Sequence, residues 1–443
     1  MRFLKWCFAG ALLQAAFHSI YQFDSDPGGE LQSSCSDVEH FLANRIVGQN
    51  ESVLAVTDAV CEHLHPGHGF GDFSGGDLAP SHARALVISL HGPPGVGKSY
   101  THELLARALF MRDPFDAAAA CPGPACPQYR VLFGMDWTSR SREAQARQLR
   151  LEIVSHLERH PGGALLVVSE YDKLDCSMRT FFRVLFDAGA GASGVSERAA
   201  RDIADRALRE GAAERERGGG AGRVQDGRDG ASAEDAAAQV VDGLLSEKAM
   251  RALRRSVIIL ESNLGMAEML RAGAIASGGT AEPAGSAADP DERERLRVRA
   301  FAARTAALKR AVHDAWLDQQ CESATDTARL VQQVGLFVPY APLDVRALED
   351  LAARLLAQRA WNVRDRIDLV WDRAVVDLFV SLVEVHDGVA TEGGKEITDV
   401  VGRQLSRALR EFSRTARDWD VQERGVPRCS LRVSKWRSAV ECG

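Results

Sequence analysis

The sequence lacks a marked excess of charge of either sign. Its 54 lysines and arginines face 61 aspartates and glutamates, which gives a formal net charge of −7 at pH 7. A chain so balanced has no broad positive field for nucleic acid, and we expect no nucleic-acid partner. Hydrophobic residues make up 45% of the 443 residues, a share that excludes a wholly disordered or collagen-like chain. By length alone the chain has room for up to three domains of about 150 residues each.

Long apolar runs are also scarce. The run at residues 6–17 is shorter than the roughly 20 residues that a membrane-spanning helix needs, and no later segment is long and apolar enough. Because Arg2 and Lys5 precede this run, residues 1–20 resemble a secretory signal peptide, or a hydrophobic leader that is not cleaved. An interfacial anchor, which would give peripheral membrane association, and an ordinary buried helix are the alternatives.

The number of cysteines points to a compartment. Nine are present, and eight would remain without the leader, an even number compatible with disulfides in an oxidising lumen. The string CPGPAC at residues 121–126 predicts a short loop bridge between its two cysteines. A second group, Cys61 with His63, His65 and His68, has side chains that can ligate a metal, but its glycine- and proline-rich surroundings favour a solvated loop.

Apolar runs of strand length alternate with helix-period segments, which predicts an α/β fold, a parallel sheet flanked by helices. The expected strands cover residues 85–90, 129–134, 164–168 and 256–260. Residues 188–243 and 272–290 are rich in small and charged residues that build no core, and we expect two low-complexity insertions there. After residue 343 the pattern is mainly helical and predicts a small separate subdomain.

Between the first expected strand and a helix the chain carries the pattern Gly-x4-Gly-Lys-Ser. Glycines allow the backbone to curl so that successive N–H groups face phosphates, and the N-terminus of the next helix adds its positive end. Lys98 would neutralise the β- and γ-phosphates of ATP, and the Ser99 hydroxyl would ligate Mg²⁺. The alternative is a coincidental glycine-rich turn. The residues predicted to bind nucleotide are Gly92, Pro93, Pro94, Gly95, Val96, Gly97, Lys98, Ser99 and Tyr100.

The ends of the third and fourth expected strands carry polar residues. Glu170 follows an apolar run, where a carboxylate can polarise the water that attacks ATP. The position before it usually holds an aspartate that keeps Mg²⁺ in place. Ser169 stands there instead, so the sequence supports nucleotide binding more strongly than hydrolysis. Asp172 is either a substitute or a helix N-terminal charge. Asn263, after the fourth run, either orients water or the γ-phosphate or is a turn residue.

The order of these motifs resembles an AAA+ P-loop ATPase, and local strings resemble the torsin family near the Clp-related branch. These strings occupy residues 46–49, 89–92, 262–265, 337–343 and 393–395. The first resembles the segment that packs against adenine in Clp-type modules, which implies that Val47 and Gly48 line the base. The last stands where torsins carry a Gly-x-Lys sensor. The resemblance therefore implies that Asn263 and Lys395 sense the γ-phosphate and that Glu170 is catalytic.

The resemblance also implies an architecture and a cellular setting. It predicts a large AAA+ subdomain at residues 41–342, a helical lid at 343–420 and a tail at 421–443. The implied function is a chaperone-like remodelling ATPase of the endoplasmic reticulum lumen or nuclear envelope, in the secretory pathway. Gln333 stands in the slot where Clp-type subunits present an arginine finger, and Arg329 is out of register.

Torsins likewise lack this arginine and rely on membrane-bound activators whose luminal domains supply it. From the resemblance we expect protein clients, such an activator, and a homo- or hetero-oligomer.

Two other functions are compatible with the sequence. One is a nucleotide-binding scaffold with little hydrolysis, which Ser169 and Gln333 favour. The other is an organellar Clp-type unfoldase whose leader is a transit peptide. The short hydrophobic leader opposes that function, and between residues 133 and 170 the chain lacks the Gly-aromatic-Val-Gly loop that grips threaded substrates. A glycan on the Asn50 sequon would exclude the unfoldase.

Overall fold

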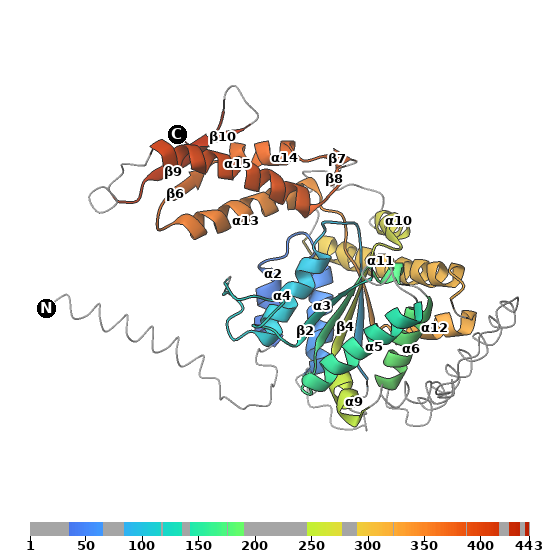
Figure 1. The fold of residues 1–443 in the computed structure, drawn as a ribbon. Coiled ribbons are helices and arrows are strands. Elements are labelled where there is room, and N and C mark those ends of the chain that lie inside the picture. The colour runs from blue at the N-terminus through green and yellow to red at the C-terminus, as the bar shows by residue number, and fades with distance from the viewer. Residues whose placement is uncertain are drawn as a thin grey trace, which may run out of the picture.

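The structure is a computed structural model (Figure 1). It describes residues 35–64, 84–116, 118–134, 142–174, 176–189, 246–276, 290–321, 323–386, 388–415, 425–434 and 439–442. The predicted leader at 1–20 lies outside the described residues, as do His65, His68 and most of the two predicted insertions. The expectations for those segments stay predictions.

An all-parallel sheet of five strands forms the centre of the N-terminal part, residues 35–342 (Figure 1). Its strands are β1 (Leu86–His91), β2 (Tyr129–Phe133), β3 (Leu165–Ser169), β4 (Val257–Ser262) and β5 (Leu336–Pro339), in the order β2-β3-β4-β1-β5. The α/β prediction is confirmed, and β1 to β4 match the expected runs within two residues. Strand β5 was not predicted, because it has only 4 residues and ends in a proline.

One face of the sheet is covered by α2 (Cys35–Ala43), α3 (Asn50–Leu64) and α4 (Lys98–Phe110). Side chains of β4 alternate between the two faces, as a strand requires. Val257 and Ile259 pack with these helices, whereas Ile258 and Leu260 pack on the other side. Glu261 continues the first series, so its side chain lies on the α4 side of the sheet.

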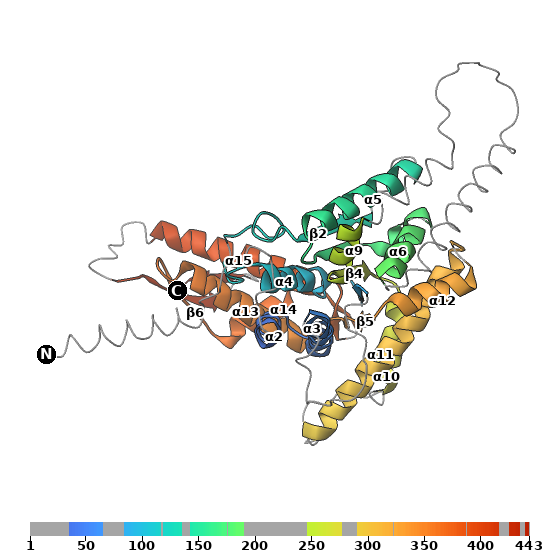
Figure 2. The same cartoon turned by 90° about the horizontal axis from the view of Figure 1, so that it is seen from below.

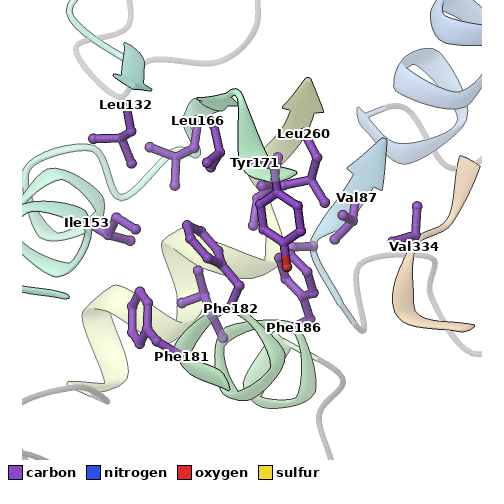
Figure 3. Close-up of a cluster of buried hydrophobic side chains, with 14 of the residues drawn as sticks. Val87, Leu132, Ile153, Leu166, Tyr171, Phe181, Phe182, Phe186, Leu260 and Val334 are labelled. Carbon is purple, nitrogen blue, oxygen red and sulfur yellow. The ribbon is translucent and has the colours of Figure 1, made fainter. Parts of the chain in front are cut away.

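The opposite face is covered by α5 (Arg142–Arg159), α6 (Cys176–Gly189), α9 (Glu247–Arg254), α11 (Pro290–Asp318) and α12 (Ala324–Gln333). Figure 3 shows aromatic side chains of α6 gathered with Tyr171, which belongs to the short 3-10 helix η3 (Tyr171–Lys173). The Tyr171 ring centroid lies 5.6 Å from that of Phe182 and 5.5 Å from that of Trp316. This buried cluster fixes the chain immediately after β3.

Helix α10 (Met266–Ala276) lies along α11, below the rest of the N-terminal part in Figure 2. Residues 272–276 were expected to begin the second low-complexity insertion, but they continue this helix. The prediction was wrong there because alanine, which dominates the segment, is the best helix former as well as a residue of low-complexity loops.

The C-terminal part, residues 343–442, has its own hydrophobic core and lies across one end of the sheet (Figure 1). Its helices are α13 (Val345–Val363), α14 (Arg373–Ser381) and α15 (Gly394–Thr415). Its strands are β6 (Asp368–Trp371), β7 (Val385–His386), β8 (Val389–Ala390), β9 (Arg428–Val433) and β10 (Val440–Cys442). This part is therefore mixed, whereas the sequence predicted a helical unit.

The expected boundary between this unit and a tail at 421–443 is also corrected. Strand β9 pairs in parallel with β6, and β10 pairs antiparallel with β9. Cys429 and Leu431 are buried against the helices of the same core, whereas Arg428 and Arg432 on either side of them are exposed. The prediction missed these strands because they are short and their outward-facing residues are mostly charged.

Four disulfides join the cysteines of the described residues: Cys35–Cys61, Cys121–Cys126, Cys176–Cys321 and Cys429–Cys442. The predicted bridge in the string at 121–126 is confirmed. The preference for a solvated loop at Cys61 and His63 is wrong, because both lie in α3. Among the residues that the structure describes, no cluster of histidine, cysteine and acidic side chains is arranged to hold a metal. None of the described helices combines the length and the apolar character needed to cross a membrane.

Candidate functional site

A cavity of about 1070 Å³ lies at the carboxyl edge of the sheet, between the N-terminal and C-terminal parts. Ligands of open α/β sheets bind at this edge. Most residues predicted from the sequence line the cavity, namely Val47, Pro94, Gly95, Val96, Gly97, Lys98, Ser99, Tyr100, Glu170, Asn263 and Lys395. Gly48, Gly92 and Pro93 do not line it. They contact residues near the cavity: the carbonyl oxygens of Gly92 and Pro93 accept from Lys98, and Gly48 packs against Ala347.

The glycine-rich loop before α4 has the backbone that its sequence requires. Gly95 and Gly97 have φ angles of 76° and 101°, a left-handed region that favours glycine. Helix α4 begins at Lys98, and the first amide groups of a helix have no acceptor within it. Gly97, the N-cap residue, has no side chain that could accept from them. Such a helix start, with its positive dipole end, is suited to hold an anion.

The Lys98 ammonium group connects this loop to the end of β4. Its Nζ donates to the carbonyl oxygens of Gly92 at 2.6 Å and Pro93 at 2.8 Å, and to Oδ1 of Asn263 at 3.1 Å. Burial lowers the pKa of Lys98 to about 8, while the nearby carboxylates of Glu261 and Asp172 act in the opposite direction. A cation with three neutral partners beside a cavity is a ready counter-charge for an anionic ligand.

Glu261 is a site residue that the sequence analysis missed. Its side chain is buried, and the Ser99 hydroxyl donates to its Oε1 at 2.9 Å. Oε2 lies 3.4 Å from Nε2 of His102 on α4. Burial alone would raise the pKa of Glu261, but hydrogen bonds from His102, Ser169 and Ser99 outweigh it and lower the pKa. The available signal was an acid in an otherwise apolar strand, two residues before Asn263.

Glu170 adopts a strained backbone at the end of β3. Its φ of 56° lies in the left-handed region, which costs a residue with a side chain about 1–3 kcal/mol. A Cβ on Gly134 would lie 2.5 Å from the carbonyl oxygen of Glu170, so glycine there leaves room for this turn. The half-buried Glu170 side chain lines the cavity next to Ser169.

A buried histidine holds the loop that carries Asn263. Nε2 of His91 lies 2.6 Å from the Ser89 hydroxyl, and Nδ1 lies 3.2 Å from the carbonyl oxygen of Leu264. Burial lowers the pKa of His91 to about 3, with a smaller lowering by the charge of Lys98, so the imidazole is neutral. The neutral ring can donate to Leu264 and accept from Ser89 at the same time. Residue 263 is thereby tied to the tip of β1.

The C-terminal part touches the glycine-rich loop directly. The amide of Gly394 donates to the carbonyl oxygen of Gly95 at 2.7 Å. A Cβ on Gly95 would lie 2.0 Å from the carbonyl oxygen of Glu392, and one on Gly393 would lie 2.8 Å from Gly95. The exposed Lys395 follows in the first turn of α15 and lines the cavity. Glycines on both sides therefore allow the contact that brings Lys395 to the site.

The other end of the cavity is apolar and joins both parts of the chain. Val47 lines it together with Leu343, Leu351 and Leu355, and the sequence analysis did not find these leucines. Leu351 and Leu355 are four residues apart on α13, so they share one face of the helix.

The segment that carries Val47 is fastened behind this wall. Gln49 donates from Nε2 to the carbonyl oxygen of Ala341 at 2.7 Å and accepts from its amide at 3.2 Å. Gly48, with a φ of 73°, would carry a Cβ 3.0 Å from that of Ala347. Gly48 thus contributes close packing against the C-terminal part and does not line the cavity.

Some predicted candidates are not brought into the cavity. Gln333 ends α12, Arg329 is exposed on the same helix, and neither lines it. Asp172 lies in η3, outside the lining, with Oδ2 3.9 Å from Nζ of Lys173. Asp172 therefore acts on the site through its charge at Lys98.

No protein-family model matches this sequence, and none of the curated proteins matches it.

Proposed function

We propose that this protein is a torsin-like AAA+ ATPase that binds ATP with Mg²⁺ and remodels protein clients. One observation carries the proposal. Residues from four separate places in the sequence, Lys98, Glu170, Asn263 and Lys395, line one cavity around a glycine-rich loop. These are the residue types that phosphoryl transfer uses for charge neutralisation, for positioning the attacking water and for sensing the γ-phosphate.

The residues present fit this ligand. The first turn of α4 and Lys98 would hold the phosphates, and the apolar wall with Val47 and Leu351 would hold the base. Ser99 would be a protein ligand of Mg²⁺, which would supply positive charge to the phosphates when bound. Glu170 would accept a proton from the attacking water, and Asn263 would orient that water or the γ-phosphate.

The AAA+ assignment adds a role for the C-terminal part as a lid. In this proposal, residues 343–442 close one side of the nucleotide site and deliver Lys395 to the γ-phosphate as the second sensor. The hydrogen bond between Gly394 and Gly95 supports this role, because it couples the start of α15 to the phosphate-binding loop. A nucleotide in the loop would then bias the position of the lid.

The luminal setting belongs to the same proposal. The four disulfides support an oxidising compartment, for which we propose the lumen of the endoplasmic reticulum or the nuclear envelope. Gln333 has no positive charge to stabilise the transition state in a neighbouring subunit. We therefore propose an oligomer whose missing arginine comes from a membrane-bound activator with a luminal domain.

A nucleotide-binding scaffold with little turnover is the second candidate. Ser169 favours it, because a hydroxyl carries no charge to help retain Mg²⁺ at the end of β3. The two functions share the binding site and differ in hydrolysis.

The binding test is the change Lys98→Ala in the full oxidised chain, measured by calorimetry with ATP. We expect affinity to fall roughly 30-fold or more, at least about 2 kcal/mol, because phosphate oxygens lose a buried cation. Lys309→Ala is the control, since Lys309 is exposed on α11 away from the cavity. Equal affinities in the two variants would contradict the phosphate site.

Turnover separates the ATPase from the scaffold. Phosphate release is measured for the full chain alone and with luminal domains of candidate activators, each carrying an exposed arginine. We expect slow release that an activator raises roughly 10³-fold, the lower end of the effect of an arginine finger. Retained ATP binding without turnover under any condition would favour the scaffold.

A further inference from the structure

We propose that Glu261 is the carboxylate that retains Mg²⁺ at this site, in the role that an aspartate at position 169 would otherwise have. The inference rests on the proposed nucleotide site. Glu261 lies on β4. The sequence pattern places the metal-positioning carboxylate at residue 169, which lies on the neighbouring strand β3.

The sheet brings the two positions side by side. Strands β3 and β4 pair in parallel with Val168 opposite Leu260, so Ser169 and Glu261 are the next neighbours in register. Side chains of paired residues point to the same face. The Ser169 side chain contributes to the lowered pKa of Glu261, which agrees with this placement. A carboxylate is therefore present beside the hydroxyl of Ser169, although it belongs to a different strand.

The carboxylate also contacts the expected protein ligand of the metal. The Ser99 hydroxyl, which ligates Mg²⁺ in glycine-rich loops of this type, donates to Oε1 of Glu261 at 2.9 Å. A group this close to a ligand atom lies within reach of the water molecules that Mg²⁺ retains. Carboxylates are the side chains that Mg²⁺ prefers next to phosphate oxygens.

Neighbouring side chains hold the other oxygen of Glu261. Nδ1 of His102 lies 2.6 Å from the Tyr129 hydroxyl, and its Nε2 lies 3.4 Å from Oε2 of Glu261. In the tautomer whose Nδ1 accepts from the Tyr129 hydroxyl, the ring proton is on Nε2, which faces Oε2. Oε2 lies toward His102 on α4, and Oε1 lies at Ser99. Groups that orient a metal-binding carboxylate in this way are a regular part of metal sites.

A buried carboxylate at position 261 destabilises the fold through its desolvation unless it has such a role. Glu261 is 3% exposed and follows four buried apolar residues in β4. An apolar side chain at 261 would complete the packing without the desolvation of a charge. A carboxylate that meets Ser99, Ser169 and His102 instead adds one negative charge at the point where Mg²⁺ is expected.

The test uses Mn²⁺ as a spectroscopic substitute for Mg²⁺. Full-length oxidised protein is saturated with ADP, and bound Mn²⁺ is measured by electron paramagnetic resonance. We expect Glu261→Gln to weaken Mn²⁺ binding roughly 10- to 100-fold. Without metal, in the presence of EDTA, ADP affinity should be unchanged or higher, because the change removes a negative charge near the phosphates.

A second variant moves the carboxylate to the neighbouring strand. The double change Ser169→Asp with Glu261→Gln should recover most of the lost Mn²⁺ affinity. Glu268→Gln is the matched control, because Glu268 is exposed on α10 and outside the cavity, and its Mn²⁺ affinity should equal that of the unchanged protein. If Glu261→Gln does not fold, Glu261→Asp replaces it, with a smaller expected loss.

The outcomes separate this inference from the proposed function. Unchanged Mn²⁺ affinity in folded Glu261→Gln, or a loss that Ser169→Asp does not restore, would show that Glu261 only anchors α4 and would overturn the inference. In that case ADP binding by the unchanged protein would leave the nucleotide site standing. Failure of the unchanged protein to bind ADP at all would reject both.

Discussion

At the scale of single residues, the site depends on polar side chains buried at the tips of apolar strands. His91 ends β1 and Glu261 lies near the end of β4, and the two residues are 1% and 3% exposed. Each has its own hydrogen-bond partners, so neither is left unsatisfied. Because these groups fix Ser99 and the loop after Asn263, changes in their protonation should affect the stability of the site before they affect the rest of the core.

His91 gives a testable pH dependence. Its pKa is lowered to about 3, below the ordinary histidine value of 6.5, so the unfolded chain binds a proton that the folded chain does not. The stability contributed by the neutral ring is complete above pH 6.5 and is lost as pH falls toward 3. Between pH 7 and pH 5, His91 should lower the unfolding free energy of the unchanged protein by about 2 kcal/mol. We expect this decrease to be absent from His91→Gln.

The measurement is urea unfolding of both proteins at pH 7, 6 and 5. His156, whose pKa burial lowers to about 4, contributes equally to both and cancels in the difference. Parallel pH profiles for the two proteins would show that His91 is not buried as a neutral ring.

At the scale of elements, the contact between the loop before α4 and the start of α15 couples the two parts of the chain. Gly393 has a φ of 60°, and a Cβ there would lie 2.8 Å from backbone atoms of Gly95. Neither backbone can yield without moving the loop or the helix. We expect Gly393→Ala to lower stability by about 1–3 kcal/mol and to weaken ATP binding, because Lys395 moves away from the site.

Gly402→Ala is the control, within α15 itself. Among the described residues nothing lies within 4 Å of a Cβ at 402, so alanine should be neutral or stabilise α15 by about 0.5–1 kcal/mol. The two variants are compared by thermal unfolding and by ATP titration. If Gly393→Ala binds ATP as tightly as Gly402→Ala, the contact does not position Lys395.

Elements with a strong local pattern could be predicted from the sequence, and elements defined by distant partners could not. The run before Gly92 and the loop to Ser99 are contiguous, so one short string specifies a strand, a turn and a helix start. Strand β9 is identified by its pairing with β6, which lies some 60 residues earlier in the chain. Glu261 accepts a hydrogen bond from Ser99 only because β4 lies between β3 and β1 in the sheet. No local sequence pattern predicts that order of strands.

At the scale of the whole molecule, disulfides link segments that are distant in the sequence and restrict the unfolded chain. Cys176 and Cys321 connect the start of α6 to the segment between α11 and α12, across 145 residues that include the first predicted insertion. Cys121 and Cys126 close a loop of only 5 residues. A cross-link restricts the unfolded chain more when the loop it closes is longer. The long bridge should therefore limit the entropy that the insertion would otherwise add to the unfolded state.

By chain entropy, the bridge over 145 residues is worth about 5 kcal/mol and the bridge over 5 residues about 2 kcal/mol. We expect Cys176→Ser with Cys321→Ser to lower the urea midpoint more than Cys121→Ser with Cys126→Ser, or to abolish the cooperative transition. Equal midpoints in the two double variants would mean that the insertion is already restricted in the unfolded chain, and that the long bridge adds no stability beyond the short one.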